Sequence, residues 1–298
     1  MSFTSRLTEA FKDAPVLPLT GRSRFCLISD CHRGNGTSND NFLKNQSLYF
    51  TALKYYCANG FTYIELGDGD ELWENRHMKQ IIEIHSNVFQ LLSLLYRQNR
   101  LYLLYGNHDM EKKSPNYSER VCNTFFCTDT QCHQKLFPGL TFHEGLILED
   151  SCCGRRIYLT HGHQADFWNS SGWKINRFLV RYIWRPLERY GVLDPTSAAK
   201  NYRHKDKIEK RLSGFAAKTG YPLITGHTHR PRLNASDLSY MNTGSCVHPL
   251  CITCIEIEGK HLSLVKWTYD TRNDRTLFVS REILSRAEFC PKNQSTDT

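Results

Sequence analysis

The chain has 298 residues, which is long enough to bury a full hydrophobic core as one large domain or two small ones. Its composition, with 40% hydrophobic and 23% charged residues, is typical of a soluble globular protein, and no run approaches the roughly 20 apolar residues of a membrane span. The formal net charge of +8 favours anionic partners, such as phosphorylated substrates, nucleic acid or anionic lipid headgroups, without choosing among them.

Residues 1–23 contain no apolar segment of the kind found in signal peptides, because charged residues interrupt them. We therefore expect an N-terminal extension over residues 1–23 and a cytoplasmic location. Short apolar runs then alternate with helical patterns. Residues 24–30, 61–66 and 100–106 are predicted to be buried strands, and residues 40–59 and 78–95 are predicted to be helices between them. This β-α-β-α-β order predicts a parallel sheet covered by helices.

The second half of the chain has a different pattern. Residues 140–150 and 155–162 flank a turn and are predicted to form an antiparallel pair. A helical section inserted at about residues 170–218 precedes further strands, and the last two flank Glu258-Gly259-Lys260, a hairpin signal. We predict one α/β domain with two sheets over residues 24–284, followed by a frayed tail at residues 285–298.

Most of the 12 cysteines lie in apolar runs, where a free cysteine behaves as a small hydrophobic residue. In the cytosol we expect them to be reduced. Two groups stand apart, namely Cys122, Cys127 and Cys132, and the adjacent Cys152 and Cys153. Neither has the C-x2-4-C pairs typical of zinc sites, so the sequence leaves open whether they form a structural site.

Residue types that bind metals follow the predicted strands. In chain order they are Asp30, His32, Asp68, Asn107, His108, Asp109, His161, His163, His227 and His229. Sites in open α/β sheets form at the carboxyl ends of strands, and an extended D-x-H or H-x-H segment places both side chains on one face. Carboxylates, imidazoles and one amide suit Mn²⁺, Fe or Zn²⁺ and exceed the needs of one ion. We therefore predict two divalent cations, with Mn²⁺ preferred.

The ordered motifs resemble the calcineurin-like metallophosphoesterase superfamily, whose pattern is D-x-H, G-D-x-x-[D/E], G-N-H-[D/E], a single His and G-H-x-H. Here these are Asp30-Cys-His32, Gly67-Asp68-Gly-Asp-Glu71, Gly106-Asn107-His108-Asp109, His161 and Gly226-His227-Thr-His229. The resemblance covers residues 24 to about 267, and all five motifs in order are highly specific. It implies a two-sheet αββα sandwich.

The resemblance also implies roles for individual residues. Asp30, His32 and His229 would hold the first metal, Asn107, His161 and His227 the second, and Asp68 would bridge the two. His108 would stabilise or protonate the leaving oxygen, and Glu71 would orient His108. The implied reaction is in-line attack on phosphorus by a hydroxide that bridges the metals.

Several neighbouring residues allow two interpretations. Arg33, beside the D-x-H motif, would bind a phosphate oxygen or be an ordinary surface arginine. His163 would add to the site or be structural. Asp109 is expected to fix its loop, and Asp70 and Glu74 are expected to be solvated acids around a helix start.

The second motif continues as Glu71-Leu72-Trp73 and lacks the arginine of protein Ser/Thr phosphatases. This form resembles the bacterial UDP-2,3-diacylglucosamine hydrolase branch, which cleaves a lipid-linked pyrophosphate and inserts a helical lid over acyl chains. That branch commonly carries arginine where this chain has His108, so the resemblance to it is partial.

The inserted section places arginines four residues apart among aromatic and aliphatic side chains: Arg177, Arg181, Arg185 and Arg189. This ridge, with Arg177 and Arg181 as candidate substrate-binding residues, would bind an anionic lipid substrate, lie at a membrane surface, or simply be a solvated face. Pro186 should kink or end the helix.

The sequence thus predicts a dinuclear, metal-dependent phosphoester hydrolase that acts on a nucleotide-linked or lipid pyrophosphate. A phosphomonoesterase, a protein phosphatase and a cyclic-nucleotide phosphodiesterase are alternatives within the superfamily. A non-catalytic scaffold that reuses the fold is the alternative of another class, and the complete set of ligands argues against it. Nucleic-acid binding is not expected, because charge alone supports it.

Overall fold

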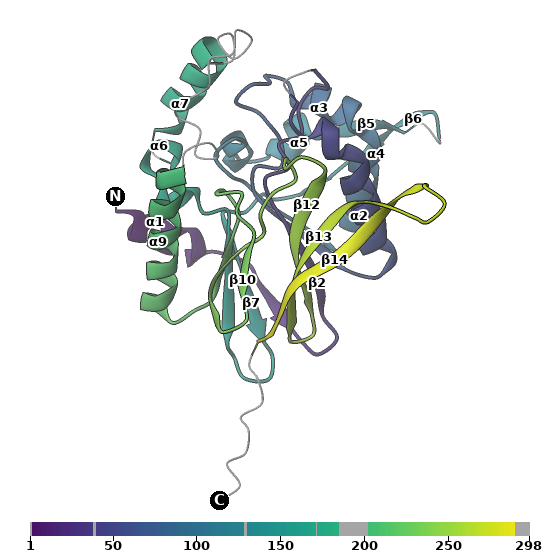
Figure 1. Cartoon of the computed structure of the whole chain (residues 1–298). Helices are drawn as coiled ribbons and strands as arrows, with labels where there is room; N and C mark the ends of the chain where they lie inside the picture. Colours follow the sequence, from purple (N-terminus) through teal and green to yellow (C-terminus); the bar gives the residue numbers. More distant parts are fainter. Residues whose placement is uncertain (1, 38–39, 128–129, 171, 185–201, 290–298) are drawn as a thin grey trace, which may run out of the picture.

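The computed structural model describes residues 2–37, 40–127, 130–170, 172–184 and 202–289. Two six-stranded sheets pack face to face, and helices cover their outer faces (Figure 1). This is the αββα sandwich expected from the motifs. A small third sheet pairs β5 (Thr124–Cys127) with β6 (Cys132–Lys135).

The first sheet has the strand order β14-β13-β12-β2-β3-β4. Its strands are β2 (Arg24–Ile28), β3 (Thr62–Leu66), β4 (Leu101–Leu104), β12 (Cys251–Glu258), β13 (His261–Thr271) and β14 (Leu277–Glu288). β2, β3 and β4 are parallel, with Leu27 opposite Ile64 and Ile64 opposite Tyr102. Their carboxyl ends therefore lie at the same edge, as the β-α-β-α-β order predicted. The predicted hairpin is β12–β13.

The second sheet has the order β1-β7-β8-β9-β11-β10. Its strands are β1 (Val16–Leu19), β7 (Gly145–Asp150), β8 (Arg156–Thr160), β9 (Leu223–Thr225), β10 (Arg232–Asn234) and β11 (Asp237–Asn242). β7 and β8 form the expected antiparallel pair, and β8 and β9 run parallel. The carboxyl ends of β8 and β9 thus also share an edge.

The helices form two outer layers. α2 (Gln46–Ala58) and α4 (Ser86–Arg97) pack on the first sheet, and α1 (Phe3–Lys12) and α9 (Tyr202–Thr219) pack on the second (Figure 1). The shorter helices are η1 (Leu43–Asn45), α3 (Met78–Ile84), η2 (Met110–Lys113), α5 (Tyr117–Val121), η3 (His163–Ala165), α6 (Phe167–Ser170), α7 (Trp173–Leu179) and η4 (Val180–Trp184). Strand residues such as Leu27 fill the space between the sheets, while Cys26 and Ile28 face the helices. Strands buried on both faces explain the continuous apolar runs in the sequence.

The amphipathic segment expected over residues 78–95 is divided into α3 and α4. The division falls at His85, which is buried and ends one helix where the next begins. Its Nε2 lies 3.1 Å from the carbonyl oxygen of Gly34 and 3.3 Å from Asp40 Oδ2. Hydrophobic periodicity continues across the break and so could not reveal it.

The described structure continues beyond both predicted ends of the domain. Residues 2–23 pack against the second sheet, because α1 buries Leu7 and β1 pairs in parallel with β7, with Leu17 opposite Leu148. Pro18 fits there because β1 is an edge strand, where a missing N–H is tolerated. At the other end β14 continues to Glu288 and Phe289 is buried, whereas residues 290–298 of the predicted tail lie outside the described residues.

The inserted section contains α6, α7 and the π-helical turn η4 before residues 185–201, and α9 after them. The predictions for Arg185, Pro186 and Arg189 fall outside the described residues.

All cysteines whose side chains the structure describes are free, including Cys122, Cys132, Cys152 and Cys153. None of the described helices combines the length and hydropathy of a membrane span.

Candidate metal centre

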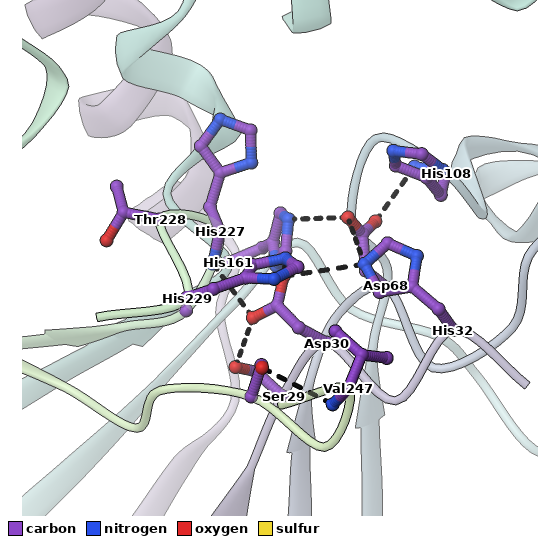
Figure 2. Close-up of polar contacts among 12 residues, drawn as sticks. Ser29, Asp30, His32, Asp68, His108, His161, His227, Thr228, His229 and Val247 are labelled. Atoms are coloured by element: carbon purple, nitrogen blue, oxygen red, sulfur yellow. Dashed lines mark hydrogen bonds and ion pairs between the residues drawn. The ribbon is translucent and has the colours of Figure 1, made fainter. Parts of the chain in front are cut away.

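Side chains from five loops meet at the edge where the carboxyl ends of β2, β3 and β4 approach those of β8 and β9 (Figure 2). They form two groups whose ligand atoms lie within 4.8 Å of one another: Asp30, His32 and His229, and Asp68, His161 and His227. Asn107 joins the second group, with its Oδ1 3.2 Å from His161 Nε2. The structure therefore brings together all seven predicted ligands.

The Asp68 carboxylate lies between the two groups. Its Oδ2 is 3.1 Å from His161 Nε2 in one group and 3.9 Å from His32 Nε2 in the other. In the first group, Asp30 Oδ1 lies 3.1 Å from His229 Nε2 and 3.9 Å from His32 Nε2. This arrangement fits a carboxylate shared by two cation positions.

The donor atoms also pass a chemical test for metal binding. His32 Nε2 is buried without a hydrogen-bond partner among the described residues, and Asp30 Oδ1 faces the rings of His229 and His32. A buried polar atom left unpaired costs about 1–3 kcal/mol, so such atoms call for an unseen partner. Two acidic groups, four imidazoles and one amide oxygen facing one another are a donor set for divalent cations.

The backbone of the ligand loops is unusual. Asp30, His32, Asp68, His227 and His229 all have positive φ angles, between 49° and 68°. The expectation that extended D-x-H and H-x-H segments aim both side chains to one face was therefore wrong. Left-handed residues other than glycine cost roughly 1–2 kcal/mol each. The tight turns change the direction of the chain directly after the strands. The ligand side chains therefore lie closer together than they would on extended strands.

Glycines beside the ligands allow the loops to approach closely. A Cβ on Gly106 would overlap the carboxylate of Asp68, and one on Gly226 would overlap the side chains of Ser29 and Asp30. These contacts give a physical reason for the glycine in the G-N-H-D and G-H-T-H motifs.

Glu71 links the metal ligands to His108. Its carboxylate oxygen Oε2 lies 2.9 Å from His32 Nδ1 and 2.7 Å from His108 Nδ1, and Oε1 lies 2.9 Å from His108 Nδ1. These three residues form a third compact group. The sequence predicted only the contact with His108. Burial opposes ionisation of Glu71, but His108 and His32 lower its pKa to about 2.

His108 is placed by several contacts. Its ring stacks on Trp73 at 4.2 Å between centroids and 21° between planes, and its backbone N–H donates to Asp68 Oδ1 at 2.8 Å. With its side chain 24% exposed, it is more open than the ligands around it. Burial opposes the charged imidazole, but Glu71 and Asp68 raise the pKa of His108.

Nearby carboxylates raise the pKa of two of the candidate ligand histidines. Despite burial, the hydrogen bond with Glu71 and the charge of Asp68 raise the pKa of His32 to about 10. Asp68 and Asp30 likewise overcome burial and raise the pKa of His161 to about 9. A metal ligand needs a neutral imidazole, so a cation bound here would compete with protons for these rings.

Neither interpretation of Arg33, as a phosphate-binding residue or as a surface arginine, agrees with the structure, because its guanidinium is buried and fully paired. Nε donates to Asp70 Oδ1 at 2.8 Å, and Nη1 and Nη2 donate to the two oxygens of Glu65 at 2.8 and 2.9 Å. Asp70 is consequently buried and not solvated.

The ionic contacts continue through Lys112, which the sequence did not single out. Its ammonium lies 2.7 Å from Asp70 Oδ2 and 2.6 Å from Asp109 Oδ2. Asp109 in turn accepts hydrogen bonds from the backbone N–H groups of Gly69 and Gly106. Asp109 therefore ties together the loops that carry Asp68 and Asn107. Its expected role in fixing the loop agrees with these contacts.

Arg177 and Arg181, the two described members of the predicted arginine ridge, contact the protein itself. Arg181 donates to the carbonyl oxygens of Trp73 and Leu72 at 2.7 and 2.6 Å. Arg177 pairs with Glu111 and lies over the ring of Trp173. Arg181 thus fastens the insertion to the segment that stacks on His108.

His163 is buried beside the second group, with its ring 5.5 Å from that of His161. It lines an open cavity of about 1000 Å³ between α1, residues 110–121 and the start of the insertion. A residue that the sequence did not identify lies nearby. Asp166 is buried, with its Oδ2 3.9 Å from His227 Nε2, and no motif marks it.

Solved structures that match the chain include Vacuolar Protein Sorting 29 from Cryptosporidium parvum, which is 14% identical, with a TM-score of 0.39 over 88% of this chain and 98% of that one. Vps29 from Chaetomium thermophilum is 12% identical, with a TM-score of 0.42 over 90% of this chain and 98% of that one. No curated protein sequence matches. The model of the calcineurin-like phosphoesterase family matches residues 23–231, and the chain therefore belongs to that family.

Proposed function

We propose that the protein is a phosphoester hydrolase that uses two divalent cations, with Mn²⁺ preferred and Fe or Zn²⁺ as alternatives. The observation that carries the proposal is the position of Asp68 between two groups of buried ligands. Asp30, His32 and His229 would hold one cation, Asn107, His161 and His227 the other, and Asp68 both. When bound, the cations would supply the charge that polarises the phosphoryl group and activates water.

The protein's own residues would complete the reaction around this centre. Glu71 accepts from His108 Nδ1, which fixes the ring and leaves Nε2 for the substrate. The raised pKa of His108 favours an imidazolium that can donate a proton to the leaving oxygen. Trp73 holds the plane of the ring by stacking.

We propose a nucleotide-linked or lipid pyrophosphate as the substrate. The support is the insertion, where Ile175, Phe178 and Tyr182 are exposed at intervals of three and four residues. An exposed apolar stripe on a chain with a net charge of +8 suits an anionic lipid, and peripheral membrane contact in the cytoplasm is part of this proposal. Hydrolysis of simple phosphomonoesters or cyclic nucleotides is the alternative, which a panel of these substrates would distinguish.

Removal of metal should abolish activity and its return should restore it. Protein treated with chelator is expected to lose hydrolysis of aryl phosphodiesters and to regain it as Mn²⁺ approaches two equivalents. Metal content by mass spectrometry and rate are measured on the same samples. Full activity without metal, or with one equivalent, would contradict the dinuclear proposal.

His108→Ala is expected to lower kcat by about 10²- to 10⁴-fold, the usual contribution of a general acid. Both cations should remain, because His108 belongs to neither predicted ligand set. The loss should be smaller for esters with acidic leaving groups, which need no proton. If the variant loses a cation, His108 is a ligand of the third group with His32 and Glu71, and the assignment fails.

A further inference from the structure

Asp166 joins the inserted section to the metal centre. It follows η3, before α6, and is buried at 1% exposure. From the metal centre, His227 Nε2 approaches its Oδ2 to 3.9 Å, and this nitrogen has no hydrogen-bond partner among the described residues. The Asp166 carboxylate is therefore a candidate partner for His227 Nε2.

Residues from both parts of the insertion, α6 and α7 before residues 185–201 and α9 after them, contact the same carboxylate oxygen or each other. From the first part, Asn169 Nδ2 donates to Oδ2 at 2.6 Å, and Asn176 of α7 donates to Asn169. From the second part, His204 Nε2 at the start of α9 lies 2.9 Å from Oδ2. Contacts from residues far apart in sequence thus fix where the carboxylate points.

Further hydrogen bonds hold the segments that carry Asp166 and His227 in place. Arg211 of α9 donates to the carbonyl oxygen of Ala165, next to Asp166, and Thr228, next to His227, donates to Glu209 of α9. α9 therefore makes hydrogen bonds to the chain neighbours of both Asp166 and His227. A buried carboxylate that orients a metal-binding histidine is a recurrent device in metalloproteins.

We infer that Asp166 is a positioning residue, which orients His227 for the second cation and couples that cation to the inserted section. The inference rests on the proposed function. In this arrangement Nε2 would carry the proton that faces Asp166, which leaves Nδ1 to hold the cation. Asp166 itself belongs to neither ligand group.

The test is Asp166→Asn, which keeps the shape and removes the charge. Titration with Mn²⁺ is expected to show the second equivalent weakened by about 10- to 100-fold, the usual effect of losing such a partner, and the first unchanged. Asp274→Asn, in the exposed turn between β13 and β14, is the matched control and should bind as wild type. In a His227→Ala background, Asp166→Asn should cause no further loss.

The outcomes separate this inference from the function on which it rests. If wild type binds fewer than two cations, the dinuclear proposal fails. If wild type binds two and Asp166→Asn binds both with unchanged affinity, or weakens both equally, only the role of Asp166 fails. Should the variant not fold, Asp166→Glu, which keeps the charge but displaces it by one methylene, gives the same comparison. Equal melting temperatures of the metal-free proteins would rule out general destabilisation as the cause.

Discussion

Asp68→Asn is expected to abolish phosphoester hydrolysis, a loss of at least about 10³-fold, on the scale reported for single electrostatic groups in active sites. The amide keeps the shape of the carboxylate but removes the charge between the two ligand groups. Asp68 is held ionised, since His161 and His108 outweigh burial and lower its pKa. Both cations depend on this charge, so metal content should fall together with rate.

Rate and bound metal should be measured on the same preparations. Glu74→Gln, which removes an acid from the same segment, is the control and should keep activity and metal content near wild type. An Asp68→Asn protein that binds two cations and turns over normally would overturn the assignment of Asp68 as the shared ligand.

Arg33→Met is expected to destabilise the protein by about 3–5 kcal/mol, the cost of breaking a buried ion pair by removing one partner. The change would leave Glu65 and Asp70 as buried carboxylates, with the hydrogen bonds that Arg33 makes to both lost. Urea denaturation of the metal-free protein measures this loss directly, because metal binding does not contribute to it.

Arg24→Met is the matched control. Arg24 pairs with Glu258 at 3.4 Å, but both side chains are almost half exposed, and such pairs contribute about 1 kcal/mol or less. If Arg33→Met were as mild as the control and instead raised KM, the interpretation of Arg33 as a phosphate-binding residue would regain support.

The sequence was sufficient for the parallel strands and for the convergence of the ligands. Asp30, Asp68 and Asn107 each follow a buried strand, and parallel strands place their carboxyl ends together. The ion pairs around the ligands could not be predicted from the sequence. Arg33 looked like a surface residue because its partner Glu65 comes from a separate strand, and only folding shows that both are buried.

Edge elements and the ligand partner Asp166 were beyond sequence reasoning for related reasons. β1 is a four-residue edge strand interrupted by Pro18, so its pattern is weak. β14 is largely exposed and lacks a clear alternation. Asp166 has no motif, since its relation to His227 arises from the packing of α9.

The left-handed conformations at five ligand positions have a consequence for the order of assembly. Segments with these residues do not adopt such turns by themselves, because each turn is disfavoured locally. Only the assembled sheets impose them, through contacts such as the His227 N–H, which follows β9 of the second sheet, to Asp30 Oδ2, which follows β2 of the first. Cation capture therefore follows the association of the two sheets, and metal should slow unfolding without accelerating the folding of the chain.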